Sequence, residues 1–240
     1  MHLDRIAPTR RPTGPNAGTQ RWRDLLFVHF ELPAEAVRPL LPAPLELDLW
    51  EGRCLVGVVP FAMFGVRPRW APFGSDFLEL NVRAYVHDDR GRPGVWFFSL
   101  DAAHLLAVWV ARLGWSLPYH HASMRLTKGE GGIDYASRRY GAGARPAELR
   151  ASYRVGRALG ASSPGGFEHF LVERYLLFSR HRGQTLVGQV HHEPYPVHEV
   201  ELVTFEQSML AANGLAGEGP IVSALYSPGV DVEVFALRPL

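Results

Sequence analysis

A tyrosine and two histidines lie together in GWSLPYHHA, residues 114–122, where an apolar helical pattern gives way to a strand pattern. A tyrosine hydroxyl such as that of Tyr119 donates a hydrogen bond to a carbonyl or enolate oxygen, and His120 titrates near neutrality. Adjacent residues on a strand point to opposite faces, so only one of these two side chains is expected to face an interior site. The segment is therefore either a reactive centre or a polar corner on the outside of a β-barrel.

A second group of chemically active residues lies on one predicted strand. In FLELNVRAYVH, residues 77–87, apolar residues occupy every second position, and Glu79, Asn81 and Arg83 lie between them. One interpretation is that solvent wets this polar face. The other, which we favour, places it inside a barrel, where a carboxylate and a guanidinium must pair with each other or face a polar ligand. Glu79 is then a candidate acid or base, and Asn81 and Arg83 are candidate substrate-binding residues.

Other common reaction centres are missing from the sequence. The histidine pairs His120-His121 and His191-His192 cannot chelate one ion as pairs, because adjacent strand residues point apart. There is no HExxH motif and only one cysteine, Cys54, so no metal is predicted; a site assembled from dispersed histidines is the alternative. No GxSxG elbow and no phosphate-binding glycine loop occurs, so no cofactor is predicted.

The elements that must position these residues are mostly strands. About a dozen short strand patterns with few helices predict a mainly β (α+β) protein: a single closed antiparallel β-barrel or cone with peripheral helices. Residues 1–20 are predicted to be a flexible arm and residues 21–240 one domain. The longest apolar helical pattern, over about 102–114, is expected to pack on the barrel wall. Pro228-Gly229 predicts a tight turn between strands near 221–226 and 230–235.

Composition excludes several classes of partner. The chain has 240 residues, 47% of them hydrophobic, and a formal net charge of +1, so it lacks the basic excess of nucleic-acid-binding domains. The apolar stretch 105–115 is too short to span a bilayer and contains Arg112, so no membrane association is predicted. A single cysteine favours a reducing, cytoplasmic setting. The expected partner is a small molecule, and a homo-oligomer is left open.

Several separate motifs resemble the YqjF-like family of uncharacterised bacterial proteins. They cover nearly the whole chain after residue 20 and occur in the order of that family. These motifs are WRDLLFVHFELPAEAVRPLLPAPLELD (22–48), VGVVPFAMFGVRPR (56–69), SDFLELNVRAYV (75–86), RPGVWFFSLDA (92–102), LPYHHASM (117–124), GFEHFLVERY (166–175) and YSPGVDVEV (226–234). The resemblance implies a fold similar to acetoacetate decarboxylase.

The more distant resemblance to acetoacetate decarboxylase implies roles for individual residues. Counting back from PAPLELD (42–48) places Arg23 on that family's active-site arginine, and FLELN places Glu79 on an active-site glutamate. The family's two active-site lysines, one of which forms the Schiff base, correspond here to Tyr119 and His120. A second family glutamate is also lost, since residues 55–58 read Leu-Val-Gly-Val.

The resemblance therefore implies that the pocket is kept and the decarboxylase nucleophile is lost. The candidate catalytic residues are Glu79, Tyr119 and His120, and the candidate substrate-binding residues are Arg23, Asn81 and Arg83. This set suits lyase, hydratase or isomerase chemistry on a small oxo-acid or aromatic acid. The alternative is a non-catalytic small-ligand-binding protein that uses the same cavity. We expect Arg23, Glu79 and Tyr119 to converge on one cavity.

Overall fold

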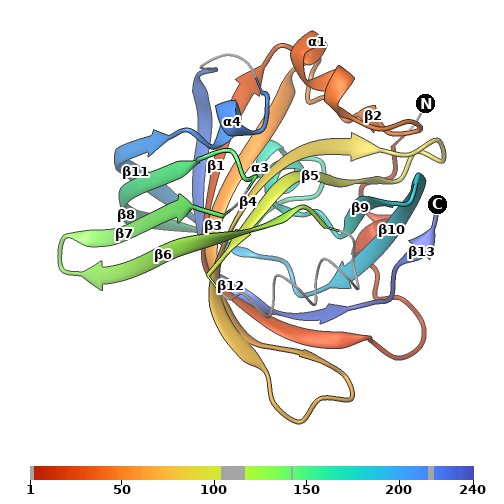
Figure 1. The fold of residues 1–240 in the computed structure, drawn as a ribbon, viewed down its shortest axis with the longest axis horizontal. Coiled ribbons are helices and arrows are strands. Elements are labelled where there is room, and N and C mark those ends of the chain that lie inside the picture. Colours follow the sequence, from red (N-terminus) through yellow and green to blue (C-terminus); the bar gives the residue numbers. More distant parts are fainter. Residues whose placement is uncertain (1–2, 104–116, 142, 216–218) are drawn as a thin grey trace.

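The computed structural model describes residues 3–103, 117–141, 143–215 and 219–240, and most of them lie in strands (Figure 1). The predicted mainly β class is confirmed. The strands are β1 Gly18–Leu32, β2 Glu46–Leu47, β3 Cys54–Pro68, β4 Ser75–His87, β5 Pro93–Ala102, β6 Tyr119–Gly129, β7 Gly132–Arg139, β8 Glu148–Ala161, β9 Leu176–His181, β10 Gln184–His191, β11 Pro196–Gln207, β12 Ile221–Val234 and β13 Arg238–Pro239. The helices are the 3-10 turns η1 Ala7–Thr9 and η2 Arg38–Leu40 and the short α-helices α1 Ala34–Val37, α3 Phe167–Val172 and α4 Met209–Ala212.

All these strands belong to one sheet, whose order is β13-β10-β9-β5-β6-β7-β8-β11-β12-β1-β3-β4-β2. Two further pairings, β5 with β4 and β10 with β12, join strands that are distant in this order. Hydrogen-bonded neighbours can therefore be followed from β12 through β1, β3, β4, β5, β9 and β10 back to β12. A second circuit runs from β5 through β6, β7, β8 and β11 to β12. It returns to β5 through β1, β3 and β4, which both circuits share. We call β12, β1, β3, β4 and β5 the shared wall.

The pairing is not wholly antiparallel, which corrects the sequence prediction. β5 runs parallel to β6 and parallel to β9. Parallel neighbours need a long crossover connection, and the one between β5 and β6 contains residues 104–116. The helix predicted over about 102–114 falls almost entirely outside the described residues; Ala102 is still part of β5. Closure into one regular barrel or cone stays a prediction.

The middle of β4 is buried on both faces, because each face contributes to a different core. On β4, Leu80, Val82 and Ala84 belong to a core that includes residues of β7 and β8. The opposite face of the same strand carries Tyr85, which belongs to a core with Phe170 of α3. The predicted alternation of this strand is therefore confirmed, although neither face is open to solvent.

The turn predicted at Pro228-Gly229 is wrong. β12 continues through both residues and pairs with β1 along its length. Gly229 has a φ of 128°, in the left-handed region, and a Cβ there would lie 2.0 Å from the carbonyl oxygen of Trp22. Glycine is required at this position because two backbones approach closely within a strand.

The N-terminal residues lie against the body of the protein before β1 begins at Gly18. Arg11 pairs with Glu233 at 2.6 Å, and the Gln189 side chain donates hydrogen bonds to the carbonyl oxygens of Pro8 (2.9 Å) and Arg10 (3.1 Å). Flexibility of this arm in solution stays a prediction. Among the described residues, no helix has the length and apolar character needed to cross a bilayer.

Candidate functional site

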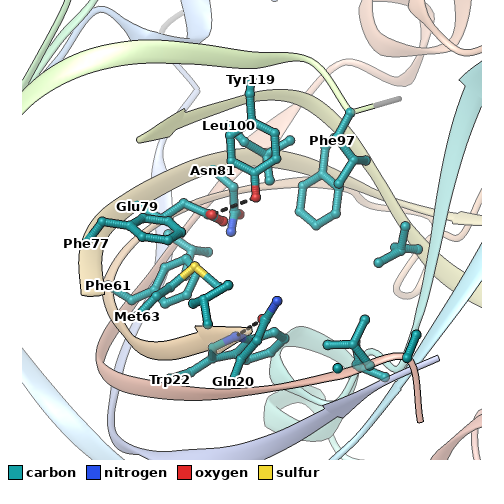
Figure 2. Close-up of a pocket in the computed structure, with 18 of the residues that line it drawn as sticks. Gln20, Trp22, Phe61, Met63, Phe77, Glu79, Asn81, Phe97, Leu100 and Tyr119 are labelled. Atoms are coloured by element: carbon teal, nitrogen blue, oxygen red, sulfur yellow. Dashed lines mark hydrogen bonds between the residues drawn. The ribbon is translucent and has the colours of Figure 1, made fainter. Parts of the chain in front are cut away.

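A cavity of about 600 Å³ lies on one side of the shared wall (Figure 2). Its described polar lining residues are Gln20, Arg67, Ser75, Glu79, Asn81, Arg83, Tyr119, Arg174, Tyr175 and Tyr195. Most of the remaining lining is aromatic or aliphatic and includes Trp22, Phe61, Met63, Phe77, Phe97, Leu100 and Leu117. A largely apolar cavity of this size with a few polar groups is typical of small-molecule sites.

Glu79 and Tyr119 form a hydrogen-bonded pair inside the cavity. They come from β4 and from the first residue of β6, and the Tyr119 hydroxyl donates to Oε2 of Glu79 at 2.8 Å (Figure 2). Both side chains are buried, with 3% and 8% of the residue surface exposed. Positions 40 residues apart in sequence thus meet in the way the sequence predicted.

Burial controls the protonation of this pair. It raises the pKa of Glu79 to about 8; the hydrogen bond from Tyr119 opposes the rise, and the charge of Asp101 adds to it. The pKa of Tyr119 is raised well above its usual value by burial and by Glu79. At neutral pH the pair is therefore mainly a carboxylic acid and a phenol. A protonated Glu79 carboxyl can act as a hydrogen-bond donor to a ligand in the cavity.

Asn81 and Arg83 follow Glu79 on the same face of β4 and also line the cavity. Arg83 is 8% exposed, donates one hydrogen bond to the carbonyl oxygen of Leu171 (3.2 Å) and lies over the ring of Phe27 (5.4 Å). In the described part of the chain no carboxylate pairs with Arg83, and neither its Nε nor Oδ1 of Asn81 has a hydrogen-bond partner. The guanidinium is thus a buried positive charge without a protein anion beside it.

Arg174, which also lines the cavity, provides a contrast with Arg83. Its Nη1 pairs with Oδ2 of Asp48 at 2.7 Å, and both side chains are almost completely buried. Arg5 of the N-terminal arm pairs with the same carboxylate. The charge of Arg174 therefore has a protein counterion, whereas that of Arg83 does not.

Arg23 does not line the cavity, which corrects the prediction that it converges with Glu79. Asp24 has a φ of 56°, and the pairing of β1 with β3 shifts by one residue after Arg23. Because of this bulge, Trp22 and Leu25 both face the cavity, and Arg23 lies on the other side. There Arg23 pairs with Asp231, whose side chain is 75% exposed.

His120 is also absent from the cavity lining. Tyr119 occupies the inward position, and its neighbour on β6 points to the other face of the strand. On that face His120 is half-buried and is the register partner of Asp101 in β5. The structure therefore brings together Glu79, Tyr119, Asn81 and Arg83, and leaves Arg23 and His120 outside.

Lys128, the only lysine of the chain, lies outside the cavity lining as well. Its Nζ pairs with Oδ1 of Asp24 at 2.6 Å, and its side chain is 53% exposed. The Tyr226 hydroxyl donates to the same carboxylate oxygen at 2.7 Å. The partner of Lys128 is thus a residue of the β1 bulge.

Several lining residues were missed by sequence reasoning. The Trp22 indole donates to the Gln20 side chain at 2.7 Å, and both residues line the cavity beside the bulge. Tyr175 and Tyr195 also line the cavity, and both bond to buried Glu173, through the Tyr175 hydroxyl at 2.6 Å and the Tyr195 backbone N–H at 2.9 Å. The alternation of side chains in β1 is the one sequence signal that could have indicated Trp22. The sequence does not show that this alternation changes at the bulge near Asp24.

The outward position of Arg23 leads to a prediction of small effect. Replacing Arg23 with alanine is expected to change ligand affinity less than twofold and stability by about 1 kcal/mol or less, since a pair with an exposed carboxylate contributes little. Chemical denaturation together with titration of any acid that binds the cavity measures both quantities. A tenfold loss of affinity with unchanged stability would instead indicate that Arg23 contacts the ligand.

Metal ligands do not cluster in the described residues: no group of three or more His, Cys, Asp or Glu side chains is arranged to hold an ion. The one cysteine, Cys54, is buried and unpaired, and burial raises the pKa of its thiol to about 11, so it is not poised to react. The absence of a metal or cofactor in the working protein stays a prediction.

Comparison with known proteins gives one family and one fold. The DUF2071 family, described as an uncharacterized conserved protein, matches residues 19–231. The uncharacterized protein YqjF of Bacillus subtilis is 35% identical over 224 residues, covering 91% of this chain and 90% of that protein.

Two solved structures illustrate the shared fold. Acetoacetate decarboxylase from Legionella pneumophila superposes with a TM-score of 0.65 at 16% identity, covering 96% of this chain and 91% of that one. The enduracididine biosynthesis enzyme MppR, solved in complex with pyruvate, superposes with a TM-score of 0.63 at 13% identity, covering 96% and 93%. The fold is therefore similar to acetoacetate decarboxylase, as the sequence resemblance implied.

Proposed function

We propose that in this chain, which belongs to the DUF2071 family of uncharacterized conserved proteins, the cavity binds a small carboxylic acid. Glu79 and Tyr119 then move a proton on that acid. The observation that carries the proposal is that the Glu79–Tyr119 pair and the uncompensated Arg83 line one cavity. We further propose that the sheet closes as a cone around this cavity.

Arg83 argues for a carboxylate in the ligand. Burying a charge is costly unless a counterion and hydrogen bonds compensate it, and among the described residues Arg83 contacts one carbonyl acceptor and two aromatic faces. A carboxylate satisfies a guanidinium through two parallel hydrogen bonds, including one from the unpaired Nε. One structural neighbour was solved with pyruvate, an oxo-acid, which is consistent with an acid of this kind.

Glu79 and Tyr119 argue for proton transfer. A carboxylic acid whose pKa is about 8 can donate a proton to a carbonyl or enolate near neutral pH and recover it afterwards, since its pKa lies close to the working pH. Tyr119, whose pKa is raised, donates hydrogen bonds without giving up its own proton. In such a cycle the proton moves from Glu79 to the substrate and returns, so no net oxidant or reductant is required. Lyase, hydratase and isomerase reactions of oxo-acids or aromatic acids fit this exchange.

The proposal is tested with acids and their uncharged analogues. Purified protein is titrated at pH 7 with pyruvate, acetoacetate, phenylpyruvate and cinnamate, and with the corresponding amides, while NMR follows substrate turnover and exchange of the α-hydrogen into deuterated water. We expect acids to bind at least tenfold more tightly than their amides and at least one acid to exchange or react. Selective binding with no exchange would assign the cavity to a ligand-binding protein, and equal binding of acids and amides would refute the proposal.

Schiff-base chemistry is not part of the proposed function. The chain has one lysine, and its amine is held in an ion pair with Asp24 outside the cavity lining. An imine requires an amine that reaches the bound substrate as nucleophile, and the Lys128 amine does not line the cavity. Arginine cannot substitute because its guanidinium stays protonated.

Incubation with acetoacetate followed by borohydride reduction is therefore expected to leave the mass of the intact protein unchanged. Lys128→Ala serves as the matched control, because it lacks the only side-chain amine. A reduced adduct that is present in the parent protein and absent from Lys128→Ala would contradict the expectation. Carbon dioxide release that depends on Lys128 would have the same meaning.

A further inference from the structure

The polarity of the cavity lining changes along β4. Arg83, Asn81 and Glu79 face the cavity at successive alternate positions, and Phe77 and Ser75 continue the same row toward the start of the strand. Polar and ionisable side chains thus occupy one end of the row. The other end is aromatic, with one small hydroxyl.

On the neighbouring strand β3 the lining is apolar from Val59 to Val66, and Arg67 follows near the end of the strand. Val59, Phe61, Met63 and Val66 face the cavity in order along β3, beside the β4 row. Figure 2 shows Phe61, Met63 and Phe77 grouped on the side of the cavity where Glu79 lies. The lining is therefore polar near Arg83 and Glu79 and predominantly apolar beyond them.

The apolar end continues to two aromatic residues in the loop between β3 and β4. Trp70 and Phe73 line the same cavity, yet each is 85% exposed. Large aromatic side chains rarely remain this exposed, because burying each removes 150–250 Å² of surface from water. The nearby Gly74 packs so closely on Gly65 that a Cβ would lie 2.6 Å from the Gly65 backbone, which holds this loop at the end of the hairpin. Arg67 is the charged lining residue at this end.

The row on β4 also sets the shape of a ligand. Arg83 and Phe77 are six residues apart in one strand, a separation of about 20 Å at roughly 3.3 Å per residue. A volume of about 600 Å³ spread over that length is narrow rather than round. It matches an elongated molecule with a chain or a single ring in cross-section.

We infer that the ligand is an amphipathic carboxylic acid, whose carboxylate meets Arg83 and whose apolar chain runs outward past Met63 and Phe77 to Trp70 and Phe73. This inference rests on the proposed function for the carboxylate and adds the apolar chain. The chain covers the exposed faces of Trp70 and Phe73, so these two residues act as specificity determinants for chain length. Short acids use only the polar end.

The test is a chain-length series. Butanoic, octanoic, dodecanoic and hexadecanoic acids are titrated into the protein by calorimetry, alongside 1-octanol and octanamide. Affinity is expected to rise about threefold to fourfold per added methylene, as for burial of one methylene in an apolar site, and octanoic acid should exceed octanamide at least tenfold. In the double variant Trp70→Ala/Phe73→Ala, hexadecanoic acid should lose at least tenfold in affinity while butanoic acid changes less than twofold.

Tyr140→Ala is the matched control, since Tyr140 is an exposed aromatic residue that does not line this cavity. It should leave the whole series unchanged. Acids that bind better than the amide with no dependence on chain length would overturn the inference and leave the proposed function standing. A series that the double variant does not change would show that Trp70 and Phe73 serve another purpose, and would also overturn it. Equal binding of octanoic acid and octanamide would refute the proposed function instead.

Discussion

Arg83→Met is expected to lower the affinity for a carboxylic acid about a hundredfold while leaving the folded protein at least as stable as before. Truncating one partner of a buried, hydrogen-bonded charge pair costs roughly 2–5 kcal/mol of binding free energy, because the other charge loses its partner. In the ligand-free protein, by contrast, the substitution is not expected to lower the free energy of unfolding. Arg83 is buried without a protein anion, and replacing a poorly compensated buried charge with an apolar residue of similar volume is neutral or stabilising by roughly 1–4 kcal/mol.

Calorimetric titration of the tightest-binding acid and urea denaturation of the ligand-free protein measure these two effects. Arg174→Met is the matched control, because Arg174 lines the same cavity but pairs with buried Asp48. That variant leaves the carboxylate of Asp48 with only Arg5 and should lose roughly 3–5 kcal/mol of stability. If Arg83→Met also loses several kcal/mol, Arg83 is a structural residue and the carboxylate proposal loses its main support.

Relative to the parent protein, Glu79→Gln is expected to gain stability as pH rises from 6 to 8. The pKa of Glu79 is raised to about 8 in the folded protein, whereas in the unfolded chain it is near the ordinary 4.5. Between these values the folded state holds a proton that the unfolded state has released, so the free energy of unfolding falls as pH rises. The fall is about 2 kcal/mol over the interval from pH 6 to pH 8. A glutamine does not ionise, yet its side-chain oxygen still accepts the hydrogen bond from Tyr119.

Urea denaturation at pH 6, 7 and 8 measures this prediction. Only the difference between the two curves is compared, because buried Asp101, His29 and His192, whose pKa values are also shifted, are present in both proteins. Tyr119→Phe is expected to change the pH dependence in the opposite direction. This variant lacks the hydrogen bond that lowers the pKa of Glu79, so its free energy of unfolding should fall more steeply toward pH 9 than that of the parent protein. Parallel curves for the parent and Glu79→Gln would mean that Glu79 is ionised throughout and cannot act as the proposed acid.

The sequence alone determined the features that follow from local alternation and from residue identity. The period-two pattern of residues 77–87 predicted that Glu79, Asn81 and Arg83 share one face, since a strand alternates its side chains regardless of what covers them. The sequence also shows directly that the chain has one lysine, Lys128. The choice of Tyr119 over His120 as the inward residue came from the family resemblance, and alternation then required His120 to point away.

Only the tertiary structure decided which side of each strand is the cavity side. At Asp24 a positive φ and a one-residue shift against β3 reverse the alternation of β1, so that Trp22 and Leu25 enter the cavity and Arg23 leaves it. A sequence pattern does not reveal a bulge, because the shift is stabilised by partners from distant segments, among them Lys128 and Tyr226 on the Asp24 carboxylate. Counting residues from a matched motif therefore assigned Arg23 to the wrong face.

The same limit explains the turn expected at Pro228-Gly229. Locally this pair favours a turn, but pairing with β1 on one side and with β10 and β11 on the other holds β12 extended. It also explains why both faces of β4 are buried: one sheet with two additional pairings gives β4 an apolar core on one face and a cavity on the other. The sequence determines which side chains share a face of a strand, and long-range strand pairing determines what that face meets, because register and closure depend on contacts between residues far apart in the chain.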